Sequence, residues 1–294
     1  MITDIESATP ALCRLQLGSE LRQLRQAAGL NGRQVVRKLL WSSSKLTRLE
    51  TGDNASVEPS DVIALCEIYG ASKEKRALLQ GYAAVTKTRR DWWQSPEYRP
   101  VIRPGFKAYL GLEATASTYL NYASEFVPGL LQTEEYVRVI LERAHQGMSS
   151  EEVDSLVAVR MNRQEALFRK ERPLKFTAIL NEAVLRRAVG GSKVMRDQLG
   201  HIIDVVTARR NVRVQVVPFR LGAHPAMDGP FVVLQFADHA ALRSIVYLEN
   251  MADAWVCRRE EDVERYEEAF TDLQALAPGP QESLGMIKKA LKEH

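Results

Sequence analysis

The spacing of hydrophobic residues in the first third of the chain follows the helical period. Leu17, Leu21, Leu24 and Ala28 recur at intervals of three or four residues, which predicts an amphipathic helix over about 15–28. The same spacing, read with capping residues and terminal glycines, predicts four more helices. These helices cover about 32–40, 43–51, 59–69 and 73–87. Five short helices joined by short loops indicate a compact helical domain.

The pattern changes in the rest of the chain, where runs rich in Val, Ile and Phe appear between helical stretches. Helices are predicted at about 108–123, 133–145, 150–170, 182–189, 195–206 and 260–277, with a short one from Ser283. Strands are predicted at 175–180, 212–217, 231–236 and 244–248. Pro128–Gly129 is expected to form a turn with a positive φ at Gly129. The second part is therefore predicted to be a mixed α/β domain.

The segment between these two parts is rich in proline and has no helical period. We expect residues 1–11 to be a flexible N-terminus and residues 12–88 to be the helical domain. Residues 89–107 are expected to be a linker packed on the second domain, because they carry several aromatic residues. The second domain is then expected over 108–294.

Charge and cysteine content narrow the class of protein. The chain of 294 residues has a formal net charge of +3, but residues 1–90 hold 14 Lys and Arg against 9 Asp and Glu, and the rest holds 26 against 28. A basic first third suits an acidic polymer as partner. Three widely spaced cysteines predict neither a disulfide framework nor a zinc site. No signal peptide or membrane-spanning run is apparent, so a cytoplasmic protein is expected.

Residues 30–52, LNGRQVVRKLLWSSSKLTRLETG, are the most informative stretch. They predict two short helices joined by a tight corner, the second with an apolar seam of Leu46 and Leu49. Small polar and cationic side chains suit a helix that enters the major groove of DNA. The candidate DNA-binding residues of this second helix are Ser42, Ser43, Ser44, Lys45, Thr47 and Arg48. A helical hairpin whose polar residues only face water remains an alternative from the pattern alone.

The segments LGSELRQLRQAAGL and VVRKLLWSSSKLTRLETG resemble the XRE family of helix-turn-helix regulators, which are related to phage repressors. The resemblance implies a structural ion pair between Arg25 and Glu50. It also implies that Arg33 and Gln34 lie near the DNA backbone, with Trp41 a structural residue at the corner. The fold class it implies is α+β, an all-helical lambda-repressor-like domain followed by a mixed α/β domain.

Two positions depart from the family pattern. Val36 stands where the family often has Ala, and Leu40 stands where it often has Gly. The first enlarges a residue at the contact between the two helices. The second places a side chain where the backbone favours a positive φ. Either change can alter the angle of the corner.

Much of the second domain is also similar to a known group. The segments FVPGLLQTEEY, RMNRQEAL, LNEAVLRRAVGG, NVRVQVVPF, GPFVVLQF and IVYLEN resemble the C-terminal domain of Streptomyces-type, WhiJ-like XRE regulators. That domain has no established function. Some members are discussed as antitoxin-like partners of small acidic proteins. The expected function is therefore sequence-specific DNA binding in transcription control, by a homodimer. The second domain would serve dimerisation, partner binding or the sensing of a small-molecule effector.

An enzyme is not expected, and no catalytic residue, metal ligand or cofactor is predicted. The GGSK segment at 190–193 lacks the spacing of a phosphate-binding loop. His224 and Asp228 are expected to form a polar loop rather than a metal site. Glu182 and Glu249 near strand ends are expected to orient loops rather than line a cleft. An antitoxin-like module that neutralises a small partner protein is the first alternative function, and a metal-dependent hydrolase in the second domain is a less favoured one.

A possible ligand or partner surface is suggested by aromatic and apolar residues in and beyond the linker. Its members are Trp92, Trp93, Tyr98, Phe126, Pro128, Leu130 and Gln132. The competing explanation for the aromatic group is packing between domains. For the VPGLLQ segment it is a buried structural turn.

Overall fold

A computed structural model describes residues 9–52, 54, 56–144, 147–170, 172–236, 244–250 and 254–294. The chain forms two compact units. The first comprises residues 1–95, 110–115 and 236–243, and the second comprises residues 96–109, 116–235 and 244–294. Each unit is described by itself below.

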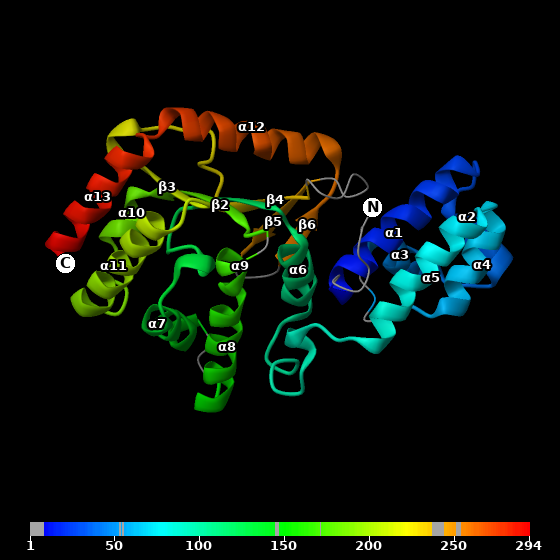
Figure 1. Cartoon of the computed structure of the whole chain (residues 1–294). Coiled ribbons are helices and arrows are strands. Elements are labelled where there is room, and N and C mark those ends of the chain that lie inside the picture. Colours follow the sequence, from blue (N-terminus) through cyan, green and yellow to red (C-terminus); the bar gives the residue numbers. More distant parts are fainter. Residues whose placement is uncertain are drawn as a thin grey trace. The chain divides into compact units, whose positions relative to one another are not determined.

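The first unit is built from five helices (Figure 1). They are α1 (Pro10–Ala27), α2 (Gly32–Leu39), α3 (Ser43–Thr51), α4 (Pro59–Tyr69) and α5 (Lys73–Thr88). Asn31 begins α2 with a capping box completed by Gln34, which satisfies two backbone groups at the helix start. Gly52 and Gly70 end α3 and α4 in the left-handed conformation, as glycine permits without steric cost. All five helices predicted from the sequence are present.

The core of this unit collects the apolar faces of the five helices. Its buried members include Leu17, Leu21, Val35, Leu46, Leu49, Leu65, Leu79 and Tyr82. Beyond α5, a short 3-10 helix, η1 (Trp92–Gln94), follows Asp91. The Asp91 carboxylate accepts from Arg14 at 3.0 Å and from the backbone N–H of Ala11 at 3.3 Å. The chain after α5 is therefore fixed to the start of α1.

The second unit surrounds one sheet. Its helices are α7 (Glu134–Ala144), α8 (Ser150–Arg163), α9 (Glu165–Phe168), α10 (Glu182–Arg186), α11 (Ser192–Ala208), α12 (Glu260–Leu276) and α13 (Pro280–Glu293), with the 3-10 turns η2 (Gly129–Leu131) and η3 (Phe219–Leu221). Helix α6 (Pro104–Thr115) contributes its residues up to Tyr109 to this unit. The strands are β1 (Thr118–Ala123), β2 (Lys175–Asn181), β3 (Val212–Val217), β4 (Phe231–Gln235), β5 (Ile245–Glu249) and β6 (Ala254–Cys257).

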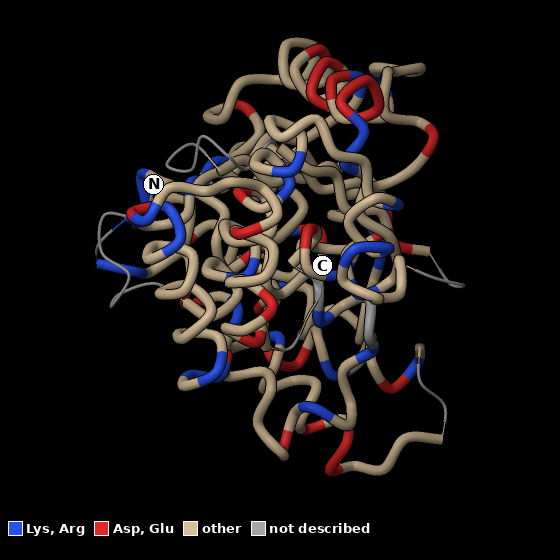
Figure 2. The backbone as a smooth tube through the Cα atoms, turned by 90° about the vertical axis from the view of Figure 1, so that its right-hand side faces the viewer, with Lys and Arg blue, Asp and Glu red and all other residues tan. Residues whose placement is uncertain are grey.

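The six strands lie in the order β3-β2-β1-β4-β5-β6. Strands β1, β2 and β3 are parallel, and β4, β5 and β6 continue the sheet by antiparallel pairs. Helix α12 covers one face, where Val233 and Val246 pack with Phe270 and Leu273 (Figure 1). The outer side of α12 is strongly acidic, and Figure 2 shows Asp and Glu gathered along this helix at the top of the view. The parallel and antiparallel pairs together make a mixed sheet, in agreement with the predicted α/β domain.

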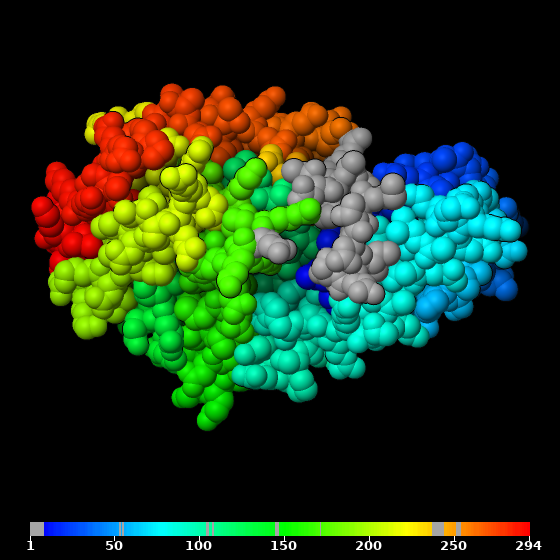
Figure 3. All heavy atoms as spheres, viewed as in Figure 1, coloured from blue at the N-terminus to red at the C-terminus, as the bar shows by residue number. Residues whose placement is uncertain are grey.

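The C-terminal helix α13 closes the β3 edge of the sheet and packs against α11, as the red and yellow-green surfaces show (Figure 3). The fully buried hydroxyl of Ser283 accepts from Val216 N–H at 3.0 Å and donates to the carbonyl of Pro278 at 2.9 Å. One side chain thereby joins the start of α13 to β3. Among the described residues, we find no helix with the length and hydropathy that a membrane span needs.

The main errors of the sequence-based prediction lie at the sheet. Residues 118–123 were predicted to end a helix, but they form β1, which pairs with β2 on one side and β4 on the other. The apolar spacing of the preceding helix runs on through Tyr119 and Tyr122, although aromatic and β-branched residues favour a strand. Strand β6 was not predicted because it is a four-residue edge strand with a mixed burial pattern.

The Gly129 prediction was also wrong. Gly129 begins η2 and is not among the glycines with positive φ. A Cβ at this position would lie 3.2 Å from Nη1 of Arg163. Close approach of this guanidinium, rather than backbone handedness, therefore favours glycine here.

Candidate DNA interface

Helix α3 presents a polar face to solvent and an apolar face to the core. Ser42 caps its start, because the Ser42 hydroxyl accepts from Lys45 N–H at 3.3 Å. Leu46 and Leu49 are buried at 4% and 2% exposure. Four predicted DNA-binding residues of the helix are exposed, namely Ser43, Ser44, Thr47 and Arg48. The structure therefore brings these side chains to one accessible helix surface.

The ion pair implied by the family resemblance is present. Arg25 Nε and Nη2 lie 2.6 and 2.7 Å from the two carboxylate oxygens of Glu50, and Arg25 Nη1 donates to the carbonyl of Leu30 at 3.0 Å. The hydrogen bond to Glu50 is the main reason that the pKa of Arg25 is raised. Both side chains are largely buried. The pair ties the end of α1 to the end of α3 and to the loop before α2.

Lys45 was predicted to contact DNA, but its side chain has partners within the domain. Its ammonium lies 2.9 Å from Asp61 Oδ1 on α4 and 3.9 Å from the centre of the Trp41 ring. No local sequence signal predicts this pair, because Asp61 lies 16 residues further along the chain. Trp41 therefore supports the corner partly through a cation–π contact with Lys45, and part of the lysine charge is offset by a carboxylate.

The corner between α2 and α3 depends on Leu40. This residue ends α2 in the left-handed conformation, with φ 55° and ψ 38°, and is 93% exposed. Val36 is partly buried and packs against the core. The backbone at Leu40 thus has the positive φ that was expected at this position. A leucine adopts the conformation that glycine usually takes.

The start of α2 lies beside this corner in the sequence and contributes two further candidates. Arg33 is exposed, whereas the Gln34 side chain accepts from Asn31 N–H at 2.8 Å within the capping box. Arg37 and Lys38, which the sequence interpretation passed over, are exposed in the last turn of α2. The sequence already placed both cations in the last turn of a predicted helix, where the helix dipole stabilises positive charge.

Comparison with known families agrees with this geometry. Residues 16–79 match a helix-turn-helix domain, and this match supports a DNA-binding regulator. Residues 106–289 match a domain of unknown function, DUF5753, over more than half of the chain. The chain belongs to the DUF5753 family. No curated protein and no solved structure matches it.

Within the DUF5753 domain, the VPGLLQ segment is buried. Leu130 and Gln132 are each 1% exposed, and Pro128 is buried as well. Gln132 Nε2 donates to the carbonyl of Val127 at 2.7 Å. The structure therefore places these residues in the interior, where they shape a turn. They do not form part of an exposed surface in this fold.

Two more glutamines of the DUF5753 domain hold the same turn. Gln164 Nε2 donates to the carbonyl of Gln132 at 2.6 Å. Gln198, fully buried on α11, donates to the carbonyl of Leu131 at 2.6 Å and accepts from Thr133 N–H at 2.8 Å. Amide side chains thus satisfy backbone groups that no helix or strand pairs. The sequence did not reveal them, because the partners lie up to 67 residues apart.

The other members of the suggested surface are divided. Trp93 is buried at 4% exposure and meets Trp92 edge to face, with ring centres 5.4 Å apart. Trp92 is 37% exposed, Phe126 is 48% exposed, and Tyr98 is partly exposed. Only Trp92, Phe126 and part of Tyr98 therefore remain accessible in the units to which they belong.

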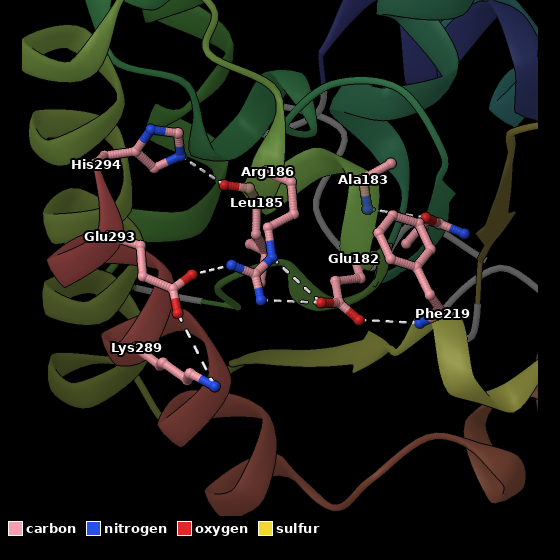
Figure 4. A network of polar contacts seen from close by, with 9 residues as sticks. Glu182, Ala183, Leu185, Arg186, Phe219, Lys289, Glu293 and His294 are labelled. Atoms are coloured by element: carbon pink, nitrogen blue, oxygen red, sulfur yellow. Dashed lines mark hydrogen bonds and ion pairs between the residues drawn. The ribbon is translucent and has the colours of Figure 1, made fainter.

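Glu182 and His224, two of the residues considered for chemistry, make hydrogen bonds to backbone groups of nearby loops. Glu182 Oε2 accepts from Phe219 N–H at 2.9 Å, and its other oxygen pairs with Arg186, which also contacts Glu293 of α13 (Figure 4). His224 Nε2 lies 3.3 Å from the Tyr122 hydroxyl, and His224 Nδ1 accepts from a backbone N–H. Burial lowers the pKa of His224. In the described ranges, no group of three His, Cys, Asp or Glu side chains is placed to hold a metal ion.

Proposed function

We propose that the protein is a sequence-specific DNA-binding transcription regulator of the XRE type, in the Streptomyces-type, WhiJ-like group. The observation that carries the proposal is the outer face of α3. It exposes short hydrogen-bonding side chains and Arg48, while the Arg25–Glu50 pair fixes the C-terminal end of the helix to the domain. A short helix with this surface fits the major groove.

The contacts fall into two groups. Ser43, Ser44 and Thr47 are short donors and acceptors suited to base edges, and Arg48 is suited to guanine or phosphate. Arg33 would contact the DNA backbone. Several candidate residues also have bonds within the domain. Ser42 caps α3, Gln34 completes the cap of α2, and the Thr47 hydroxyl donates to the Ser43 carbonyl at 3.0 Å. Lys45 would contribute less than Arg48, because Asp61 already offsets its charge.

We further propose that the active form is a homodimer. One helix reads few bases, and two half-sites about one helical turn apart multiply the specificity. The DUF5753 domain would serve dimerisation, partner binding or signal sensing. An antitoxin-like role would appear as a stable complex with a small acidic protein.

The test begins with DNA sequences selected from a random pool by the full chain. Arg48→Ala should weaken binding to the selected sequence by about 10- to 100-fold, since a good base contact contributes about 1–3 kcal/mol. Lys73→Ala removes a similar charge from α5, outside α2 and α3, and is the matched control. Fluorescence anisotropy gives the dissociation constants, and thermal unfolding verifies that both variants are folded. Equal affinities of Arg48→Ala and the parent chain would exclude the assignment of α3 to the groove.

A further inference from the structure

Arg160, on α8, is a cation with few partners inside the second unit. Its Nη1 donates to Gln132 Oε1 at 3.1 Å. Among the described residues this is the one hydrogen bond of the guanidinium, and no carboxylate lies within 4.0 Å of it. Four of the five N–H donors therefore have no acceptor among the residues that the structure describes.

The surrounding protein makes this an unusual place for a free charge. Burial, followed by repulsion from Arg163, lowers the pKa of Arg160 to about 10, although Glu249, Tyr247 and Tyr109 act in the opposite direction. Even partial loss of hydration is costly for a charged group unless an anion compensates it. The part of the chain that the structure describes does not supply that anion at hydrogen-bonding distance.

The guanidinium is nevertheless reachable. Arg160 is partly exposed, and none of its nitrogens is both sealed from solvent and without a partner. The Gln132 side chain that orients it is fixed in turn by its bond to the Val127 carbonyl. Arg160 is therefore held in position while its remaining donors are open to a small molecule, which is the preorganised state that favours binding.

Aromatic rings pack against Arg163 at the end of α8. Arg163, one turn beyond Arg160, is 5.1 Å from the ring centre of Phe106 and 5.4 Å from that of Tyr109. Tyr109 stacks on Tyr247 at 4.0 Å, and the Tyr247 hydroxyl donates to Glu249 at 3.1 Å. All of these residues belong to the second unit. Tyr109 and Tyr247 are 1% and 5% exposed, so these stacked rings belong to the packed interior near α8.

We propose that Arg160 anchors a binding site for a small-molecule oxyanion, a carboxylate or phosphate group, beside the Tyr109 and Tyr247 rings. The planar fork of arginine matches either group through two parallel hydrogen bonds. Gln132 acts as the positioning residue. The site is separate from α3, and the proposal does not depend on DNA binding.

The first experiment measures the thermal unfolding of the full chain with inorganic phosphate or succinate, each compared with chloride at the same ionic strength. At about 100 times its dissociation constant, a bound anion should raise the unfolding temperature by roughly 5–10 °C. The two probes distinguish a phosphate from a carboxylate preference. If neither anion raises the temperature above the chloride value, the proposal is wrong.

Arg160→Gln and Arg160→Met identify the residue responsible. Without added anion, both variants should unfold at the same temperature as the parent chain or higher, because an unpaired cation surrounded by protein has been removed. Both should lose the rise caused by phosphate or succinate. Arg265→Gln makes the same charge change on the exposed side of α12 and should keep the full rise.

Two results would overturn the proposal at this stage. An anion-induced rise that persists in the Arg160 variants would place the anion elsewhere. Failure of both variants to fold, or a clear drop in their unfolding temperature without anion, would show that Arg160 is a structural residue.

Discussion

Polar side chains are exposed on the outer face of α3 but buried in the turn after β1. On α3, Ser43, Ser44 and Arg48 are exposed. In the turn, Gln132 and the buried Gln198 direct their amides to backbone groups. Exposed polar groups remain available to an outside partner, whereas buried ones are committed to the fold. The difference separates side chains that are accessible to a partner from side chains that hold a turn.

The same comparison isolates Arg160. It lies among the inward-facing polar residues of the DUF5753 domain, yet most of its donors have no protein acceptor in the described part of the chain. Arg25, in the first unit, is largely buried and has two bonds to Glu50 and one to Leu30. The hydrogen bonds of Arg25 explain its place in the fold, whereas the open donors of Arg160 are available to a ligand.

The largest effect is expected where a buried amide is removed. Gln198→Leu leaves the Leu131 carbonyl and the Thr133 N–H without partners, and each such group costs about 1–3 kcal/mol. The free energy of unfolding should fall by about 4 kcal/mol, measured by urea denaturation. The same change at the exposed Gln281 of α13 should have little effect. Similar losses in the two variants would contradict a structural role for the turn.

A close helix contact gives the next prediction. A Cβ at Gly18 of α1 would lie 2.5 Å from the Leu49 carbonyl oxygen of α3. Gly18→Ala should therefore push α1 and α3 apart and destabilise the first unit by about 3 kcal/mol. Gly285→Ala, in α13 with open space around it, should be neutral or stabilising. Calorimetry of both variants decides whether the tight contact controls stability.

The ion pair behind α3 is expected to contribute less. Glu50→Gln removes the charge opposite Arg25, whose side chain is 15% exposed, and should cost about 2 kcal/mol in urea denaturation. Glu58→Gln alters an exposed pair with Lys87 and should cost less than about 0.5 kcal/mol. If the two substitutions have equal effects, the Arg25–Glu50 pair is no more than a surface contact.

Local signals predicted the first unit well. Asn31 and Ser42 cap the starts of α2 and α3, and Gly52 and Gly70 end α3 and α4. These signals lie next to the helix ends in the sequence, so they predict where the helices begin and end. The Lys45–Asp61 pair was not predictable in this way, because it depends on how α3 meets α4. The individual DNA contacts of α3 stay predictions.

The second unit depends more on distant partners. The strand pattern identified β2, β3, β4 and β5, but β1 continued an apolar spacing that also fits a helix. Its strand state comes from pairing with β2, which begins at Lys175, and with β4, which begins at Phe231. The bonds of Gln198 and the proposed role of Arg160 were equally hidden, since neither position carries a local motif. The conformation and contacts of these residues depend on partners far away in the sequence, because tertiary context often overrides local preference.

The smallest stability effect concerns the corner between α2 and α3. Leu40 holds a left-handed conformation that costs a non-glycine residue about 1–2 kcal/mol, and its 93% exposed side chain gains little from packing. Leu40→Gly relieves this strain but adds freedom to the unfolded chain, so a gain of about 0.5 kcal/mol is expected. Leu40→Ala retains the strain and is the matched control. An affinity for selected DNA that is unchanged in Leu40→Gly would mean that Leu40 sets only the backbone corner. A loss of affinity shared by both variants would mean that the exposed leucine side chain itself contacts DNA, and would extend the outward-facing surface of α3 to the corner.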